Sequence, residues 1–332
     1  MQLVVARSRS LREILVSAAL LICCDVCSSA YSGEVRTSAK QGQFRDCRDC
    51  PLMQIIAGGG FELTTPEATQ FVDVKLAVPK NPVLITIPKP FAVGIYDVTR
   101  GEYRRFIEST KRLGGQGCEG LWDGQRWRKD PRATWRRPGF PQSEDDPVVC
   151  VSWDDAHAYV DWLNLRLAAA RNSRSAATHP GRYRLLTGAE WEYVARGGPG
   201  DGPYPDNAKL TDFANLGLDQ CWPCGGRKAG RDRWLYTSPV GSLAPNRLGL
   251  YDVFGNVWQW TDDCYQREPY LRQPKDGSQI AEGDCEIRML RGVSWDDSSR
   301  GSSWRELILQ RNERRTSVRN NADGFRVAKS LE

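Results

Sequence analysis

Residues 248–260 read LGLYDVFGNVWQW, and the organisation of the chain is clearest around them. Their centre, Asp252-x-x-Gly255-Asn256, taken alone predicts a turn, because aspartate, glycine and asparagine are the residues that tight turns favour. Elsewhere the chain offers only short strand-like runs, separated by long loops rich in glycine, proline and asparagine. The runs lie at 84–87, 92–96 and 325–328. This pattern predicts a loop-rich α+β domain.

Three helices are predicted from capping boxes, in which a hydroxyl residue and an acid three positions later satisfy each other's backbone N–H groups. The pairs are Thr99 with Glu102, Ser152 with Asp155, and Thr187 with Glu190. Apolar residues follow the first two boxes with helical spacing, which predicts that both helices pack on a core. These residues are Tyr103, Phe106 and Ile107 in the first helix, and Ala156, Tyr159, Val160 and Leu163 in the second.

Composition excludes some function classes. The 332 residues include 46 basic and 41 acidic side chains, and the net charge of +5 is too small to indicate a nucleic-acid-binding surface. The only histidines are His157 and His179, so a multi-histidine iron or zinc centre is excluded. His157 precedes Asp161 by four residues, which predicts a surface pair on a helix. His179 lies in a loop, and neither histidine is assigned to catalysis.

The first thirty residues have the pattern of a secretory signal. Three arginines precede an apolar run from Ile14 to Cys24, and Ser28-Ser29-Ala30 suits a signal peptidase. The run is too short to span a membrane, and no other stretch is long enough. We therefore expect a signal peptide at 1–30, a flexible lead-in at 31–46, a domain from 47 to 329, and no membrane span. The expected location is the periplasm or the exterior of the cell.

Eight cysteines follow the predicted signal, and an even number in an exported chain favours disulfides. Cys118 and Cys150 bracket one loop and Cys264 and Cys285 another, so each pair is predicted to close its loop, although spacing does not prove connectivity. Two Cys-x-x-Cys pairs could instead bind zinc, but their separation is far from the usual spacing of a zinc ribbon. The Cys-x-x-Cys pairs are Cys47 with Cys50 and Cys221 with Cys224.

A series of short segments, in a fixed order, resembles the formylglycine-generating enzyme family, also called the sulfatase-modifying factor family. The resemblance covers most of the chain after the predicted signal. It implies a single irregular domain distantly like the C-type lectins. The segments are DVT at 97–99, PVVCVSW at 147–153, YRLLTGAEWEY at 183–193, LGLYDVFGNVWQW at 248–260, RGVSW at 291–295 and GFRVA at 324–328.

The same resemblance implies an oxidase site that this chain lacks. In the enzymes of the family, two cysteines five residues apart follow the segment that matches Arg291–Trp295, and their thiolates bind Cu(I). The corresponding positions here are Asp297 and Ser302, and no cysteine follows Cys285. Carboxylate and hydroxyl oxygens are poor ligands for Cu(I), so copper is not expected. We expect no catalytic residue of that kind. Oxygen-ligated metal chemistry or hydrolysis at Asp296, Asp297 and Ser302 is the alternative.

Structural calcium is a further implication of the resemblance, since family members bind it through carboxylate, amide and backbone oxygens. One set of matching positions is Asn215, Leu216, Asp232 and Trp234. A second set is Asp252, Gly255, Asn256 and Gln259, in which glutamine replaces the usual glutamate and should weaken binding.

The stretch from Trp122 to Phe140 mixes tryptophan with arginine and lysine. Such a mixture can bind a peptide or a glycan, and the alternative is a solvated loop with its tryptophans packed inward. Taken together, the sequence predicts an exported, non-catalytic binding or accessory module, with a protein or peptide partner, or a glycan. The alternatives are an oxidase that converts protein cysteine to formylglycine, or a related metal-dependent oxidation, and a purely structural role in an extracytoplasmic complex.

Overall fold

A computed structural model describes residues 42–63, 83–122, 127–172, 179–199, 202–205, 208–217, 233–267, 272–297 and 303–332. Its strands are β1 (Gln43–Phe44), β2 (Met53–Ile56), β3 (Gly59–Leu63), β4 (Val83–Ile87), β5 (Phe91–Gly94), β6 (Cys118–Trp122), β7 (Trp127–Asp130), β8 (Gly181–Leu185), β9 (Trp258–Tyr265), β10 (Asp284–Arg291), β11 (Arg311–Arg315), β12 (Asp323–Phe325) and β13 (Val327–Leu331). Its helices are α1 (Arg100–Thr110), α2 (Trp153–Asn172), α3 (Gly188–Ala195), α4 (Leu210–Phe213) and α6 (Trp304–Leu307).

All three predicted capping boxes are present. Thr99 caps α1 and Thr187 caps α3, each with reciprocal bonds to its glutamate. At the start of α2, the backbone N–H of Asp155 donates to Ser152 Oγ at 3.2 Å, and the backbone N–H of Ser152 donates to the Asp155 carboxylate at 3.1 Å. The apolar residues predicted to pack on the core from α1 and α2 are buried. Local sequence therefore fixes where these helices begin.

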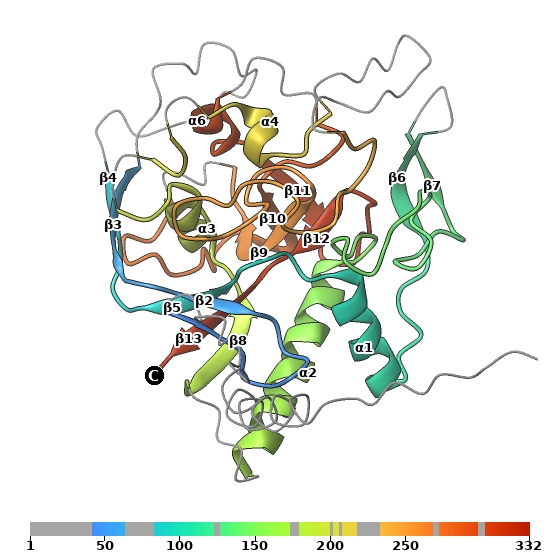
Figure 1. Ribbon diagram of the computed structural model, residues 1–332, viewed down its shortest axis with the longest axis horizontal. Helices are drawn as coiled ribbons and strands as arrows, with labels where there is room; N and C mark the ends of the chain where they lie inside the picture. The colour runs from blue at the N-terminus through green and yellow to red at the C-terminus, as the bar shows by residue number, and fades with distance from the viewer. Residues whose placement is uncertain are drawn as a thin grey trace, which may run out of the picture. The chain divides into compact units, whose positions relative to one another are not determined.

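Two sheets organise the domain. A five-stranded sheet has the order β1-β2-β5-β13-β8, and a four-stranded sheet has the order β11-β10-β9-β12, in which only β12 runs parallel to its neighbour. Helices α1 and α2 lie side by side, while β6 and β7 form a separate hairpin (Figure 1). Residues 41–332 form one compact unit. The predicted α+β class, with many loops, is confirmed.

The predicted strand at 325–328 is in fact two strands. Phe325 ends β12 in the four-stranded sheet, Val327 begins β13 in the five-stranded sheet, and Arg326 lies between them. The change of sheet at Arg326 breaks the run, a feature that an apolar pattern of four residues cannot reveal. The runs at 84–87 and 92–96 correspond to β4 and β5, although β5 ends at Gly94.

Arg326 is fully buried at this crossing and is surrounded by acceptors. Nη1 donates to the carbonyls of Gly94 and Ile95, both at 2.9 Å, and Nη2 donates to the carbonyl of Tyr251 at 2.6 Å. The carboxylate of Asp97 lies 3.2 Å from Nη2, and burial raises the pKa of Asp97 to about 8 although the positive charge of Arg326 opposes the rise. One side chain therefore joins β5, the loop before β9 and the crossing between the two sheets.

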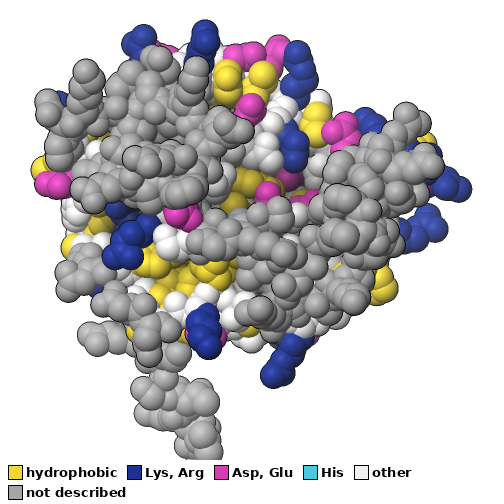
Figure 2. Space-filling model, turned by 90° about the horizontal axis from the view of Figure 1, so that it is seen from above, with side chains coloured by type: hydrophobic (Ala, Val, Ile, Leu, Met, Phe, Trp, Pro, Cys, Tyr) yellow, Lys and Arg dark blue, Asp and Glu magenta, His cyan; other side chains and the backbone are white. Residues whose placement is uncertain are grey.

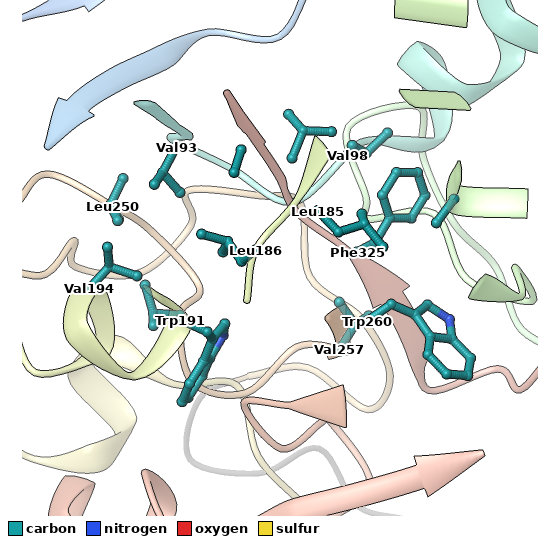
Figure 3. Close-up of a cluster of buried hydrophobic side chains, with 14 of the residues drawn as sticks. Val93, Val98, Leu185, Leu186, Trp191, Val194, Leu250, Val257, Trp260 and Phe325 are labelled. Carbon is teal, nitrogen blue, oxygen red and sulfur yellow. The ribbon is translucent and has the colours of Figure 1, made fainter. Parts of the chain in front are cut away.

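The largest hydrophobic cluster lies where these elements meet. Figure 3 shows side chains from β5, β8, α3, β9 and β12 directed toward a common interior, including Val93, Leu185, Trp191, Trp260 and Phe325. The indole nitrogens of Trp191 and Trp260 are satisfied inside the cluster, by Gln259 Oε1 and by the carbonyl of Val151. Hydrogen bonds of the two indole N–H groups therefore stabilise the core together with its apolar contacts.

The end of the predicted lead-in belongs to the folded domain. Strand β1 pairs with β2, and Asp46 lies 2.6 Å from the buried ammonium of Lys329 on β13. Tyr183 also donates to Asp46 at 2.6 Å. These contacts attach residues 42–46 to the five-stranded sheet, and within this segment only Gln43–Phe44 form a strand. Residues 1–41, which include the predicted signal, lie outside the described residues.

Three of the predicted disulfides are formed: Cys47–Cys50, Cys118–Cys150 and Cys264–Cys285. Closing the 32-residue separation between Cys118 and Cys150 stabilises the fold by about 3–4 kcal/mol in the chain-entropy model. Cys221 and Cys224 lie outside the described residues. Among the described residues, no helix combines the length and the apolar character that crossing a membrane requires.

Charged residues are mixed over the surface. On the face shown in Figure 2, lysine and arginine side chains alternate with aspartate and glutamate side chains, and the described residues form no extended area of one sign. Salt bridges at the surface are local, such as that between Arg104 and Glu108 on α1.

Replacing Arg326 with methionine should lower the free energy of unfolding by about 3–5 kcal/mol, because the buried carboxyl group of Asp97 loses its charged partner and buried carbonyls lose a hydrogen-bond donor. Urea denaturation measures the change. Arg182→Met is the matched control, because Arg182 forms an exposed pair with Asp161 at 3.7 Å and its loss should cost no more than about 1 kcal/mol. Equal losses in the two variants would contradict the role given to Arg326.

Candidate functional site

A polar pocket of about 610 Å³ lies where the β6–β7 hairpin meets the four-stranded sheet. The sheet contributes residues from β9 and β11, and the loops after β10 and before β12 complete the wall. The lining residues are Glu119, Gly120, Arg128, Lys129, Trp258, Asp296, Asp297, Asn312, Arg314, Asn320 and Ala322. The pocket thus gathers acids, bases and amides from five separate stretches of the chain, which makes it the candidate functional site.

Several hydrogen bonds hold Asp297 in place in the pocket. Its Oδ2 accepts the backbone N–H of Ser294 at 2.8 Å and lies 2.6 Å from Ser294 Oγ. Trp258 also donates a side-chain hydrogen bond to its carboxylate. The backbone carbonyl of Asp297 accepts the N–H of Gly217 at 3.1 Å. The carboxylate is therefore fixed in position.

Backbone strain lies directly before this site. Val293 has φ 59°, a left-handed conformation that β-branched residues rarely adopt, and Gly292 before it has φ 105°. These two residues turn the chain out of β10 and deliver Ser294 to the aspartates. Strain of this kind is held by the surrounding structure and is concentrated at functional positions.

Asp296 completes a pair of adjacent carboxyl groups. Its Oδ1 lies 2.6 Å from the same Ser294 Oγ that contacts Asp297. Burial and, second, the neighbouring charge of Asp296 raise the pKa of Asp297 to about 7, and the hydrogen bonds from Ser294 and Trp258 oppose the rise. A carboxyl group that titrates near neutrality can serve as a proton donor or acceptor.

The opposite wall carries matched charges. Arg314 donates to the fully buried Asp323 at 2.6 Å, and Lys129 lies 4.0 Å from Glu119. The Cys118–Cys150 disulfide lies at the base of this wall, since Cys118 begins β6 and Glu119 follows it. The hairpin is thus tied to the domain where it lines the pocket.

The predicted site residues are only partly brought together. Asp297 lines the pocket beside Asp296, whereas Ser302 lies outside the described residues. Asp252, Gly255, Asn256 and Gln259 lie in the loop around Arg326 and at the start of β9. Gln259 Oε1 accepts from Trp191 at 3.0 Å and from Arg326 at 3.3 Å, and Gln259 Nε2 donates to the Asp252 carbonyl at 2.9 Å. The side chain of Gln259 is therefore engaged by protein partners at both of its polar atoms, and calcium binding by this set stays a prediction.

The other calcium set is described only in part, because Asp232 lies outside the described residues. Asn215 is buried, and its Nδ2 donates to the carbonyl of Tyr236 at 2.9 Å, which fixes the orientation of the amide. Leu216 follows it along the chain and is also buried. Across the described residues, no group of three or more histidine, cysteine, aspartate or glutamate side chains is placed to hold a metal ion.

His157 does not form the predicted pair with Asp161. Its Nε2 lies 2.7 Å from Asp262 Oδ1 on β9, and its ring lies 3.7 Å from that of Trp153. Asp161 faces Arg182 instead. The partner was missed because it lies 105 residues away on a strand, beyond the reach of helical spacing. Trp135, in the Trp122–Phe140 stretch, is buried, in agreement with the inward-packing alternative for that residue.

Several pocket residues gave no signal in the sequence. Arg314, Asn312 and Asn320 lie in polar runs without a motif, and Glu119 follows a cysteine that indicated only a disulfide. Trp258 lies within the segment 248–260, but nothing in the pattern tells which face of the strand it occupies. The one usable signal was the repeated acid at Asp296 and Asp297 after a strand-like run.

Asp297→Asn should change how stability depends on pH. The pKa of Asp297 is about 7 in the folded protein and near 4 in the unfolded chain. Its protonation therefore stabilises the fold at low pH, and this stabilisation is lost as the pH rises from about 4 toward 7. The variant should therefore gain on the order of 1–2 kcal/mol relative to wild type between pH 5 and pH 8, after allowance for partial exposure. Urea denaturation across this range measures it. Asp161→Asn on the surface is the control. Parallel curves for wild type and Asp297→Asn would contradict the prediction.

Comparison with known proteins agrees with this architecture. The family model for the sulfatase-modifying factor enzyme 1-like domain matches residues 40–331. The inactive C-alpha-formylglycine-generating enzyme 2 of Bos taurus is 30% identical over 250 residues, which cover 68% of this chain and 71% of that protein. The formylglycine-generating enzyme of Thermomonospora curvata is 29% identical over 248 residues, 65% of this chain and 72% of that protein.

Solved structures show the same fold. PvdO from Pseudomonas aeruginosa superimposes with a TM-score of 0.65 at 30% identity, covering 87% of this chain and 98% of that structure. Treponema denticola variable protein 1 has a TM-score of 0.52 at 20% identity, a likeness of fold alone. The family match spans nearly all of the described residues. The chain therefore belongs to the sulfatase-modifying factor family, whose members include active formylglycine-generating enzymes and relatives named as inactive.

Proposed function

We propose that this protein is an exported member of the family that binds a protein or peptide partner and does not work as a formylglycine-generating oxidase. The observation that carries the proposal is the pocket at Asp297. At the position that the family resemblance assigns to a copper-binding cysteine, the chain has a carboxylate fixed by Ser294 and Trp258.

The chemistry of the available donors supports the same reading. Cu(I) prefers soft thiolate ligands, and the pocket presents carboxylate, amide, guanidinium and indole groups. Of the six described cysteines, all are in disulfides, and none lines the pocket. The residues therefore do not fit the copper centre of the active relatives, and no oxidation step is assigned to them.

A binding role is supported by the form of the pocket. It is open, polar and built by a rigid sheet, with a hairpin held by the Cys118–Cys150 disulfide as its outer wall. Disulfides form and persist in oxidising compartments, which supports export. The likeness to a relative that is named as inactive is compatible with loss of oxidase activity in this branch.

Mass spectrometry of a Cys-x-Pro-x-Arg peptide tests the proposal. The peptide is incubated with the purified protein, Cu(I) and oxygen, and the Thermomonospora curvata enzyme is the positive control. We expect no conversion of cysteine to aldehyde by this protein, because its pocket offers no thiolate to copper. Conversion above the level of copper alone would establish the oxidase alternative and end the proposal.

Structural calcium at Asn215, Leu216, Asp232 and Trp234 is a second, separate proposal. Carboxylate, amide and backbone oxygens are the ligands that calcium prefers, and the fixed amide of Asn215 suits such a site. Removal of calcium with EGTA should lower the melting temperature by several degrees, and calcium but not magnesium should restore it. Asp232→Ala should abolish this response, and Gln259→Ala should leave it. A melting temperature insensitive to EGTA would contradict calcium binding.

A further inference from the structure

Ser294 makes two short contacts with neighbouring aspartates, and its single hydroxyl hydrogen cannot account for both if the two aspartates are ionised. Ser294 Oγ lies 2.6 Å from Asp296 Oδ1 and 2.6 Å from Asp297 Oδ2. A distance of that length between two oxygens requires a hydrogen between them. A serine hydroxyl has one hydrogen and can donate it to only one carboxylate. The second short contact therefore needs a hydrogen supplied by a carboxyl group.

That hydrogen can lie on either of the two carboxyl groups. Asp297 Oδ2 already accepts the backbone N–H of Ser294 at 2.8 Å, and Trp258 donates to the same carboxylate. These hydrogen bonds stabilise the ionised form of Asp297, whereas its burial stabilises the protonated form. Either Asp296 or Asp297 can therefore carry the additional hydrogen and donate it to Ser294 Oγ. The three side chains form a relay with one titratable proton.

We propose that Asp296, Ser294 and Asp297 form an acid–base centre in which two carboxyl groups hold one proton between them, facing the polar pocket. The proposal adds a proton-exchange chemistry to the binding site described above. It rests on the proposed function only for the use of that pocket, since the proton count depends on Ser294 and its two neighbours alone.

The charge of the pocket supports one retained proton. The described groups that face or neighbour the pair are the acids Glu119 on β6 and Asp323 on β12, and the bases Arg128 and Lys129 on β7 and Arg314 on β11. With both aspartates ionised, these groups leave one negative charge in excess. One proton on the pair makes the described pocket neutral, which is the less costly state for partly buried charges.

The same balance indicates the class of ligand. A ligand with a single ammonium or guanidinium group would balance the excess negative charge of the described groups, so that the proton could leave as the ligand binds. Burial and the charge of Asp296 raise the pKa of Asp297 to about 7, so this exchange falls in the physiological range. Binding of such a cation should therefore strengthen as the pH rises through neutrality.

Infrared difference spectroscopy of the full protein at pH 6 tests the shared proton. The carbonyl stretch of a protonated carboxyl group is separate from the carboxylate bands, and subtraction of a variant spectrum from wild type removes the contribution of other buried acids such as Asp97. We expect Asp296→Asn and Asp297→Asn each to abolish the same band. Removal of either carboxyl group takes away the negative charge that helps to hold the proton, so we expect the remaining carboxyl group to ionise.

Two independent protons would give a different result. If the band persists in Asp296→Asn, burial alone protonates Asp297 and the shared-proton proposal is wrong. It is equally wrong if wild type and both variants have identical spectra. Ser294→Ala keeps both acids and should shift the band, so it covers the case in which an asparagine variant does not fold. Oxidation of the Cys-x-Pro-x-Arg peptide would disprove the proposed function, but it would not change these infrared spectra. Failure of the proposed function and failure of the shared-proton proposal can therefore be told apart.

Discussion

The buried guanidinium of Arg326 is the contact on which the arrangement of the two sheets depends. The chain leaves the four-stranded sheet at Phe325 and enters the five-stranded sheet at Val327, and Arg326 lies between them. Its N–H groups donate to the carbonyls of Gly94, Ile95 and Tyr251 at the crossing, where buried acceptors need hydrogen-bond partners. A planar group with five N–H donors suits this task, because a lysine ammonium could not reach acceptors on several sides in fixed directions.

The same interaction positions the pocket through strand β9. Gln259 accepts from Arg326 and from Trp191 in the interior. Side chains alternate across a strand, so Trp258 lies on the other face and can donate to Asp297 in the pocket. Strand β9 thus connects the buried arginine to the acid pair. The left-handed turn at Gly292 and Val293 brings Ser294 to the same place from β10.

Local features of the fold could be predicted from the sequence, and distant pairings could not. The capping boxes at Thr99, Ser152 and Thr187 act within four residues, so their patterns were sufficient. The disulfide between Cys118 and Cys150 was predicted because both residues bracket one loop. The partner of His157, by contrast, depends on the packing of a helix against β9.

In the candidate site, too, local features could be predicted from the sequence and distant contacts could not. The acid at Asp297 and its place in the family pattern were visible in the sequence, whereas its coupling to Asp296 through one hydroxyl depends on side-chain geometry. The wall formed by Glu119, Lys129 and Arg314 comes from separate stretches without a motif. In the second calcium set, Gln259 contacts Arg326, Trp191 and the carbonyl of Asp252, and these contacts could not be read from the pattern.

A family whose active members are oxidases here presents a pocket built around two carboxyl groups and one serine. Neutron diffraction from deuterated crystals grown near pH 6 is the most direct measurement of this claim, because it locates hydrogen positions. The account predicts a deuteron in each of the two contacts of Ser294 Oγ, one with Asp296 and one with Asp297. A deuteron in only one contact, with both carboxylates ionised, would contradict it.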